Sequence, residues 1–179
     1  MNPPIVVVGP QRSGTTVASK IIAYDFDLKA VDESEFTLGN DYSNCVVQLP
    51  GVLGSYIFLK HAYPGLQFVY IIRDKEDIIA SMRRIQWCRG DVFDWEAFMS
   101  DWIDNCVLQW HLIKQDMPDQ CAEVYYDSLR DHPLFIAEKD RQDFTSKQWQ
   151  VDKPVGPRYW IKHNQALLEL YGCTNRTTG

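Results

Sequence analysis

Residues 4–16 read Pro-Ile-Val-Val-Val-Gly-Pro-Gln-Arg-Ser-Gly-Thr-Thr, which is the clearest structural signal in the chain. The β-branched run between Pro4 and Gly9 is typical of a strand buried on both faces of a parallel sheet. After Gly14, apolar residues recur at helical spacing, so a helix follows the loop directly. A strand, a loop with two glycines and a helix in this order predict a phosphate-binding loop.

The remaining sequence alternates between predicted strands and predicted helices. We expect strands at residues 28–31, 56–59, 66–72 and 122–126, and helices at residues 94–115 and 159–171. Another helix is expected to start in the acidic stretch 73–77 and to carry Ile78, Ile79, Met82 and Ile85 on one face. This alternation predicts a three-layer α/β fold with a mainly parallel sheet, helices on both faces and right-handed crossovers.

The predicted helix at residues 94–115 carries a stripe of large apolar residues at three- and four-residue spacing, Trp102 and Trp110 among them. Such a stripe could form a platform for a ligand. Its regular spacing favours burial against the sheet, so we expect it to belong to the core.

The composition is that of a folded globular protein without a basic surface. The 179 residues include 18 Lys and Arg against 24 Asp and Glu, a formal charge of −6, which excludes a generally basic nucleic-acid coat. With 45% hydrophobic and 23% charged residues, the chain is expected to fold as a single domain over residues 1–179. Its opening apolar run is too short for a membrane span or a secretory signal, so we expect no membrane partner.

Five cysteines lie scattered along the chain, and no two are spaced as C-x-x-C. This odd number disfavours a disulfide framework, and the spacing disfavours a zinc site. We therefore expect a reducing, cytoplasmic location.

The loop at residues 9–16 has an unusual distribution of charge. Its glycines let the backbone approach an anion, and the N–H groups of residues 13–16 with the helix dipole form a phosphate cradle. A nucleotide triphosphatase would have lysine at position 15, where this chain has Thr15. The cation is instead Arg12, so the loop is suited to a less highly charged ligand than a triphosphate.

A second anion site is predicted at the end of the strand at residues 66–72. Arg73 follows that strand, and Ser81 lies eight residues later in the next helix. An arginine at the carboxyl end of a strand and a hydroxyl in the next helix can converge on one phosphate.

These two elements resemble the sulfotransferases that use 3′-phosphoadenosine 5′-phosphosulfate (PAPS), whose first loop typically reads P-[KR]-x-G-T-T. Pro10 is displaced by one place from that pattern because Gln11 intervenes. The strand that ends in Arg73, with Ser81 eight residues on, is similar to the family's 3′-phosphate site. The motifs are most similar to those of the tyrosylprotein and cytosolic sulfotransferases. The resemblance implies a P-loop nucleotide-triphosphatase-like sulfotransferase fold, with Arg12, Ser13, Gly14, Thr15, Thr16, Arg73 and Ser81 as cofactor-binding residues.

Two further stretches extend the resemblance. Residues 124–133 are similar to the family's R-Y-E-D-L…P segment, which implies that Tyr126 contacts the adenine, although Asp127 replaces the usual Glu. Residues 153–160 are loosely similar to the loop that closes over the 3′-phosphate, with Lys153 or Arg158 as its cation.

The resemblance implies transfer of a sulfuryl group from PAPS to a hydroxyl or amine, leaving adenosine 3′,5′-bisphosphate (PAP). Arg12 would neutralise charge on the leaving oxygen, and no metal is expected, since a sulfuryl group carries less charge than a terminal phosphoryl group. The acceptor could be a small molecule, a glycan or a peptide, and the oligomeric state is open.

Two residues are candidates for the general base. Glu33 lies 21 residues after Arg12, the separation found between the loop arginine and the catalytic glutamate of tyrosylprotein sulfotransferases. His61 belongs to Lys60-His61-Ala62-Tyr63-Pro64, which is similar to the K-x-H-x-P segment of cytosolic sulfotransferases with one residue missing. In that comparison Lys60 matches the lysine near the sulfuryl bridge.

Two other functions stay open at this point. A protein of the same fold could bind the nucleotide without transferring a group. A nucleotide kinase is disfavoured because Thr15 occupies the lysine position.

Overall fold

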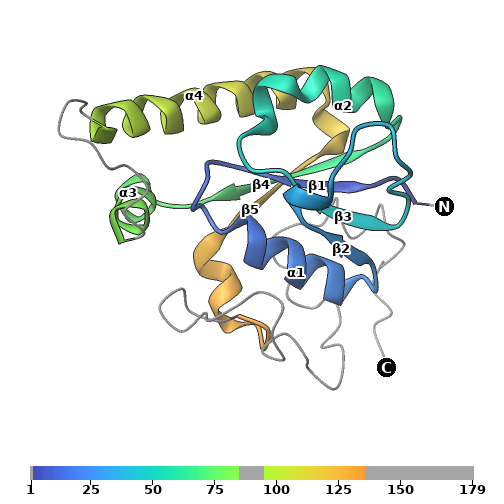
Figure 1. Ribbon diagram of the computed structural model, residues 1–179, viewed down its shortest axis with the longest axis horizontal. Coiled ribbons are helices and arrows are strands. Elements are labelled where there is room, and N and C mark those ends of the chain that lie inside the picture. Colours follow the sequence, from blue (N-terminus) through green and yellow to red (C-terminus); the bar gives the residue numbers. More distant parts are fainter. Residues whose placement is uncertain (1, 85–94, 136–179) are drawn as a thin grey trace.

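Five parallel strands form one sheet in the order β2-β3-β1-β4-β5 in this computed structural model, which describes residues 2–84 and 95–135 (Figure 1). The strands are β1 (Ile5–Val8), β2 (Lys29–Val31), β3 (Cys45–Gln48), β4 (Gln67–Ile72) and β5 (Cys121–Tyr125). The α-helices are α1 (Thr15–Asp25), α2 (Tyr56–Ala62), α3 (Lys75–Arg84) and α4 (Trp95–Asp116). Short 3-10 helices are η1 (Glu33–Glu35), η2 (Val52–Ser55), η3 (Pro118–Gln120) and η4 (Tyr126–Asp131).

The central strand β1 explains why residues 5–8 are uniformly apolar. Ile5 and Val7 face the core under α1, whereas Val6 and Val8 face the opposite core under α2 and α4. All four residues are at most 1% exposed. Because successive side chains of a strand alternate between faces, a strand covered on both sides has no position for a polar residue. The expected α/β fold, with helices on both faces of a parallel sheet, is confirmed.

The prediction of a strand at residues 56–59 was wrong, because these residues begin helix α2. The apolar run has the composition of a buried strand, yet only one of its side chains is packed away. Leu59 is 2% exposed, whereas Ile57 and Phe58 are 61% and 67% exposed. Strand β3 was not predicted. The predicted helix at residues 159–171 lies outside the described residues.

Helix α4 confirms that much of the apolar stripe belongs to the core. Ile103, Cys106, Trp110 and Ile113 are buried, and the Trp110 ring stacks on Tyr70 with the ring centroids 5.0 Å apart. The stripe is narrower than its spacing indicated, because Phe98 and Val107 are 53% and 40% exposed.

No helix within the two described ranges combines the length and the hydrophobicity needed to cross a bilayer.

A buried pair, His132 and Asp25, joins the end of α1 to the segment after η4. His132 Nδ1 accepts the backbone N–H of Leu134 at 3.1 Å, so its proton is on Nε2, which donates to Asp25 Oδ1 at 3.0 Å. Both side chains are almost fully buried. A donor buried without an acceptor costs free energy, so the pair holds two distant parts of the chain together.

Substituting Asp25 tests this pair. We expect Asp25→Ala to lower the free energy of unfolding by about 1–3 kcal/mol, because it leaves the His132 N–H buried without its acceptor. Asp25→Asn keeps an acceptor oxygen in nearly the same volume and should cost clearly less. Urea denaturation of the two variants measures the difference, and equal losses would contradict this account.

Candidate active site

The carboxyl ends of the five strands share one edge of the sheet, because all neighbouring pairs are parallel. In Figure 1 the strands run from the side marked N toward the side on which α3 lies. The loop after β1 lies at this edge, at the middle strand, and the backbone of Gly9 accepts the N–H of Gly51 from the segment after β3 at 3.0 Å. Ligands of open α/β sheets bind at such an edge.

The loop at residues 9–14 has a backbone that L-residues rarely adopt. Gly14 has a φ of 102° and Arg12 a φ of 68°. A Cβ on Gly14 would lie 2.4 Å and 2.5 Å from Cδ2 and Cε2 of Tyr126, so the close approach of this ring requires glycine. Ser13 N donates to the backbone oxygen of Pro10 at 3.0 Å, which tightens the turn before α1.

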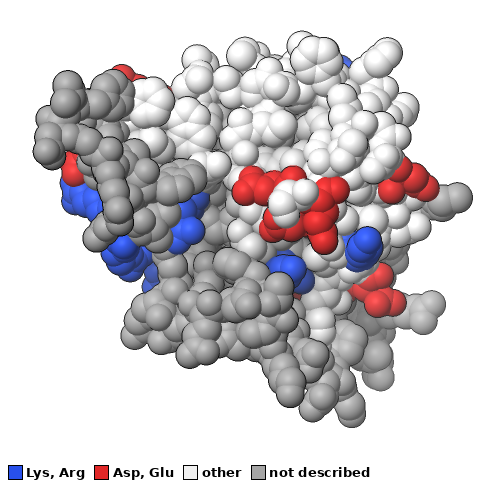
Figure 2. Space-filling model, viewed as in Figure 1, with Lys and Arg blue, Asp and Glu red and all other residues white. Residues whose placement is uncertain are grey.

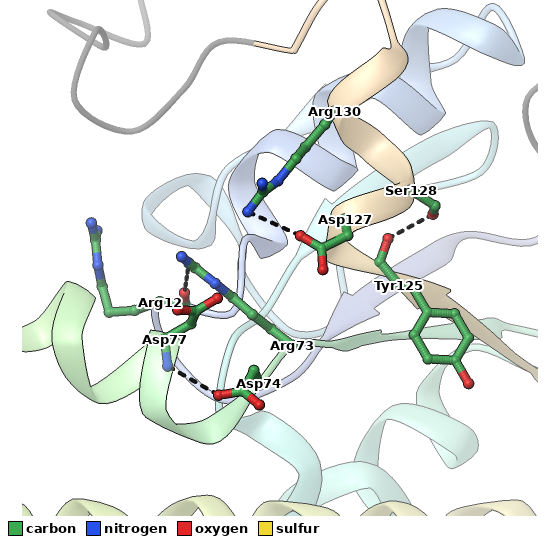
Figure 3. Close-up of polar contacts among 8 residues, drawn as sticks. All are labelled: Arg12, Arg73, Asp74, Asp77, Tyr125, Asp127, Ser128 and Arg130. Atoms are coloured by element: carbon green, nitrogen blue, oxygen red, sulfur yellow. Dashed lines mark hydrogen bonds and ion pairs between the residues drawn. The ribbon is translucent and has the colours of Figure 1, made fainter.

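The two predicted anion sites form one contiguous cluster. Arg12 Nε donates to Ser81 Oγ at 3.1 Å. Arg73 Nη1 donates to the backbone oxygen of Arg12 at 2.8 Å, a bond that Figure 3 shows. The residues come from the β1 loop, the end of β4 and the middle of α3. Two hydrogen bonds therefore link three segments far apart in sequence: the Arg12 side chain reaches Ser81, and the Arg73 guanidinium reaches the backbone of the loop.

Helix α3 is held in place at its start and along its side. Asp74 Oδ1 accepts the backbone N–H groups of Glu76 at 2.9 Å and Asp77 at 3.3 Å, which caps the helix and confirms the predicted acidic N-terminus. Ile78 and Met82 pack against α4. Ser81, between them on the same helix, is fully buried, so its position is fixed by this packing.

Tyr126 forms a wall of the cluster. The guanidinium carbon of Arg73 lies 4.1 Å from the centroid of its ring, and Gly14 approaches the Cδ2–Cε2 side. Phe135 meets the ring edge-on at 5.7 Å between centroids. The residue is only 4% exposed, so the expected contact with adenine does not come from an open ring face in this conformation. Its geometric role here is to position Arg73 and the loop.

Arg130 is a residue of this site that the sequence analysis missed. Its guanidinium carbon lies 5.9 Å from the Tyr126 ring centroid, and its Nη2 pairs with Asp127 Oδ1 at 3.0 Å (Figure 3). Both residues belong to the 3-10 helix η4, and no motif in the sequence marks the approach of Arg130 to the ring. The ring is thus flanked by a cation from β4 and another from η4.

Glu33 also lies at the carboxyl edge, just after β2. In η1 a capping box engages its neighbours: Asp32 Oδ1 accepts the N–H of Ser34, and Glu35 Oε2 accepts the N–H of Asp32. The Glu33 carboxyl takes no part in this box. Loss of hydration raises the pKa of Glu33 above its ordinary value, and the Asp32 carboxylate adds to the rise. A raised pKa suits a general base.

Lys60 and His61 do not share this edge, and the structure contradicts their expected position beside the loop. They lie in the last turn of α2, which leads into the amino end of β4. Lys60 Nζ pairs at 2.7 Å with Asp116, at the end of α4, which precedes the amino end of β5. Because the run at residues 56–59 is a helix, it carries these residues to the edge opposite Arg12. Lys153 and Arg158 lie outside the described residues.

Charge is divided between two areas. On the face shown in Figure 2, basic side chains gather at the side on which α3 lies, whereas acidic side chains form a separate group nearer the middle. Arg83 and Arg84, at the end of α3, are exposed. Arg83 forms an ion pair with Glu96 of α4, so part of this basic charge is already neutralised.

The residues of the loop fit an anionic group such as a phosphate. The Ser13 hydroxyl is buried and has no hydrogen-bond partner among the described residues, so a ligand oxygen would satisfy it. The start of α1 supplies backbone N–H groups beside it. In the same part of the chain, no group of three or more His, Cys, Asp or Glu side chains is arranged to hold a metal ion.

Comparisons with known proteins address the fold. No protein-family profile and no curated protein matches the chain. The sulfotransferase domain from the curacin biosynthetic pathway matches with a TM-score of 0.54 at 11% identity, over 97% of this chain and 90% of that domain. Mouse sulfotransferase SULT7A1, solved with PAP, gives 0.50 at 15% identity, over 74% of this chain and 54% of that enzyme.

A gluconokinase from Sinorhizobium meliloti 1021 also matches, with a TM-score of 0.47 at 14% identity, over 69% of this chain and 82% of that enzyme. At such low identities the likeness establishes the fold alone. The chain has the P-loop-like α/β fold that also occurs in these two sulfotransferases.

Substituting Gly14 tests the packing at the loop. We expect Gly14→Ala to lower the free energy of unfolding by about 1–3 kcal/mol, because the new methyl group would collide with Tyr126 and the φ of 102° is strained for alanine. Gly39 provides a control, since it also has a positive φ but nothing lies within 4 Å of its Cβ position. Urea denaturation measures both variants, and equal losses of stability in the two would contradict this account.

Proposed function

We propose that the protein is a sulfotransferase that moves a sulfuryl group from PAPS to a hydroxyl or amine. The observation that carries this proposal is the contiguous cluster of Arg12, Arg73 and Ser81 beside the phosphate-binding loop. One anion site next to another suits a nucleoside with phosphates at both its 3′ and 5′ positions. The shared fold with sulfotransferases is consistent with this function.

The order of the strands suggests how the ligand lies. The loop follows the middle strand β1, Arg73 and Ser81 lie on the β4 side, and Glu33 follows β2 on the other side. A 5′-phosphate held by the loop and a 3′-phosphate held by Arg73 and Ser81 direct the transferable group toward β3 and β2. The proposed base therefore lies on the side where the acceptor has to enter.

The reaction follows from these roles. A lone pair of the acceptor oxygen or nitrogen forms a bond to sulfur, while the bond from sulfur to the bridging oxygen of the 5′-phosphate breaks, and that oxygen keeps the electron pair. The acceptor proton passes to the Glu33 carboxylate. The loop N–H groups and the Ser13 hydroxyl stabilise charge on the 5′-phosphate as it leaves. The Arg12 guanidinium, bound to Ser81 in this conformation, neutralises the neighbouring phosphate charge.

The ligand should bind without a metal. Thr15 occupies the position of the lysine that contacts the β- and γ-phosphates in nucleotide triphosphatases, and the cations of this site are arginines. Arginine binds phosphate through two parallel hydrogen bonds and needs no bridging ion.

Binding measurements test the nucleotide. We expect PAP to bind in the presence of EDTA, and Arg73→Gln or Ser81→Ala to weaken it, by about 10- to 100-fold for the arginine, because a charged hydrogen bond contributes about 1.5–3 kcal/mol. Adenosine 5′-phosphate should be affected much less by Ser81→Ala, because the hydrogen bond between Ser81 and the loop involves the Arg12 side chain and not the loop backbone. The control Lys29→Gln removes an exposed cation from the amino end of β2 and should change neither affinity. Binding of ATP that requires magnesium, without binding of PAP, would instead indicate a kinase.

The pH dependence of transfer tests the base. Glu33 accepts a proton only when ionised, so the rate should be full above its pKa and should fall as the pH drops through that pKa, which lies above the ordinary glutamate value. Glu33→Gln should lower kcat about 100-fold or more and abolish this acidic limb, with PAP affinity unchanged. The control Glu35→Gln should keep the limb. A chain that binds PAP but transfers sulfuryl to none of a panel of hydroxyl and amine acceptors would be a nucleotide-binding protein.

A further inference from the structure

Gln48, the last residue of β3, is a mostly buried residue at the carboxyl edge, and its amide atoms are not among the fully enclosed polar atoms of the described residues that lack a partner. It is 5% exposed, and its side chain forms no hydrogen bond with another residue of the described ranges 2–84 and 95–135. A second glutamine in the same sheet differs in this respect. Gln67, at the amino end of β4, is 6% exposed and donates through Nε2 to the backbone oxygen of Gly65 at 3.1 Å. Gln67 is therefore satisfied by the fold, whereas Gln48 has donors and an acceptor left for another molecule.

The position of Gln48 follows from the strand register. It pairs with Val7 of β1, two residues before Gly9, and Val47 beside it pairs with Val31 of β2. Side chains alternate along a strand, so Gln48 shares the face of Val46, which packs in the core under α1. Gln48 thus lies at the end of β3 where α1 begins, between the loop and the segment that carries Glu33.

The three arginine side chains of the site lie away from the β3 side of the loop. Arg12 Nε is bound to Ser81, and Arg73 and Arg130 flank Tyr126, so all three cations lie on the β4 side or beyond it. A group attached to the 5′-phosphate and directed toward β3 therefore meets Gln48 before it meets Glu33. An amide N–H is a suitable donor to a sulfuryl oxygen, because it binds the anion without adding a charge that would hold it in place.

We propose that the side-chain amide of Gln48 donates a hydrogen bond to a sulfuryl oxygen of the bound donor and so positions the transferable group for the acceptor. This inference rests on the proposed function, because it requires PAPS at the loop. It assigns a role to a residue with no acid or base chemistry at neutral pH, and it makes Gln48 a determinant of the choice between donor and product.

The difference between PAPS and PAP provides the test, since only PAPS carries the sulfuryl group. We expect Gln48→Leu to weaken PAPS about 5- to 10-fold, the equivalent of about 1–1.4 kcal/mol, while PAP affinity stays within twofold. Both ligands are titrated calorimetrically without acceptor. Gln48→Glu, which removes the donor hydrogens at nearly constant shape, should lower the ratio of PAPS to PAP affinity at least as far. Gln67→Leu is the matched control and should leave the ratio unchanged.

The outcomes separate this inference from the function on which it rests. A lower ratio in both Gln48 variants with an unchanged ratio in Gln67→Leu supports the contact. Equal loss of PAPS and PAP affinity in Gln48→Leu, or no loss of either, would overturn it while leaving the sulfotransferase proposal standing. If the unaltered protein bound neither nucleotide, the proposed function itself would fail, and the role of Gln48 with it.

Discussion

The hydrogen bond from Arg73 Nη1 to the backbone oxygen of Arg12 joins the two halves of the site. It connects the end of β4 to the loop after β1, and it holds that loop in a conformation with a positive φ at Arg12. Tyr126 supports the same bond from the side, since its ring lies against both Gly14 and the Arg73 guanidinium. The cluster therefore depends on three segments that meet only in the folded chain, and the loop has little freedom to move away from Ser81.

The scaffold below this contact is a sheet whose middle strand has no solvated face. The four apolar residues of β1 bury alternate side chains in the two cores, which fixes both the register of β1 and the height at which its loop emerges. Each fully buried aliphatic side chain contributes about 1.5–3 kcal/mol relative to exposure. The loop can therefore keep strained glycine and arginine conformations, because the strand before it is held firmly.

Patterns within short stretches of sequence predicted the phosphate-binding loop and the segment from β4 to α3. The loop was predicted from the strand before it and the helix after it, and Arg73 with Ser81 from the next such pair. Hydrogen bonds link the two predicted sites in the structure. Lys60 and His61 were misplaced because a four-residue apolar run has no periodicity that separates a strand from a helix with one buried side chain. Arg130 and Gln48 were missed for a different reason: their significance comes from neighbours in space, a tyrosine ring and an adjacent strand end, that the sequence order does not reveal.

The capping box in η1 gives the three acidic residues of this segment different roles. The carboxylates of Asp32 and Glu35 accept backbone N–H groups within η1. These bonds fix the turn, and they leave the carboxyl group of Glu33 outside the capping box. Glu33 follows β2 and the phosphate-binding loop follows β1, and β3 lies between these two strands in the sheet. In the proposed enzyme, exchanges of residues around Glu33 would alter the acceptor side of the site and leave the loop and the β4 side unchanged.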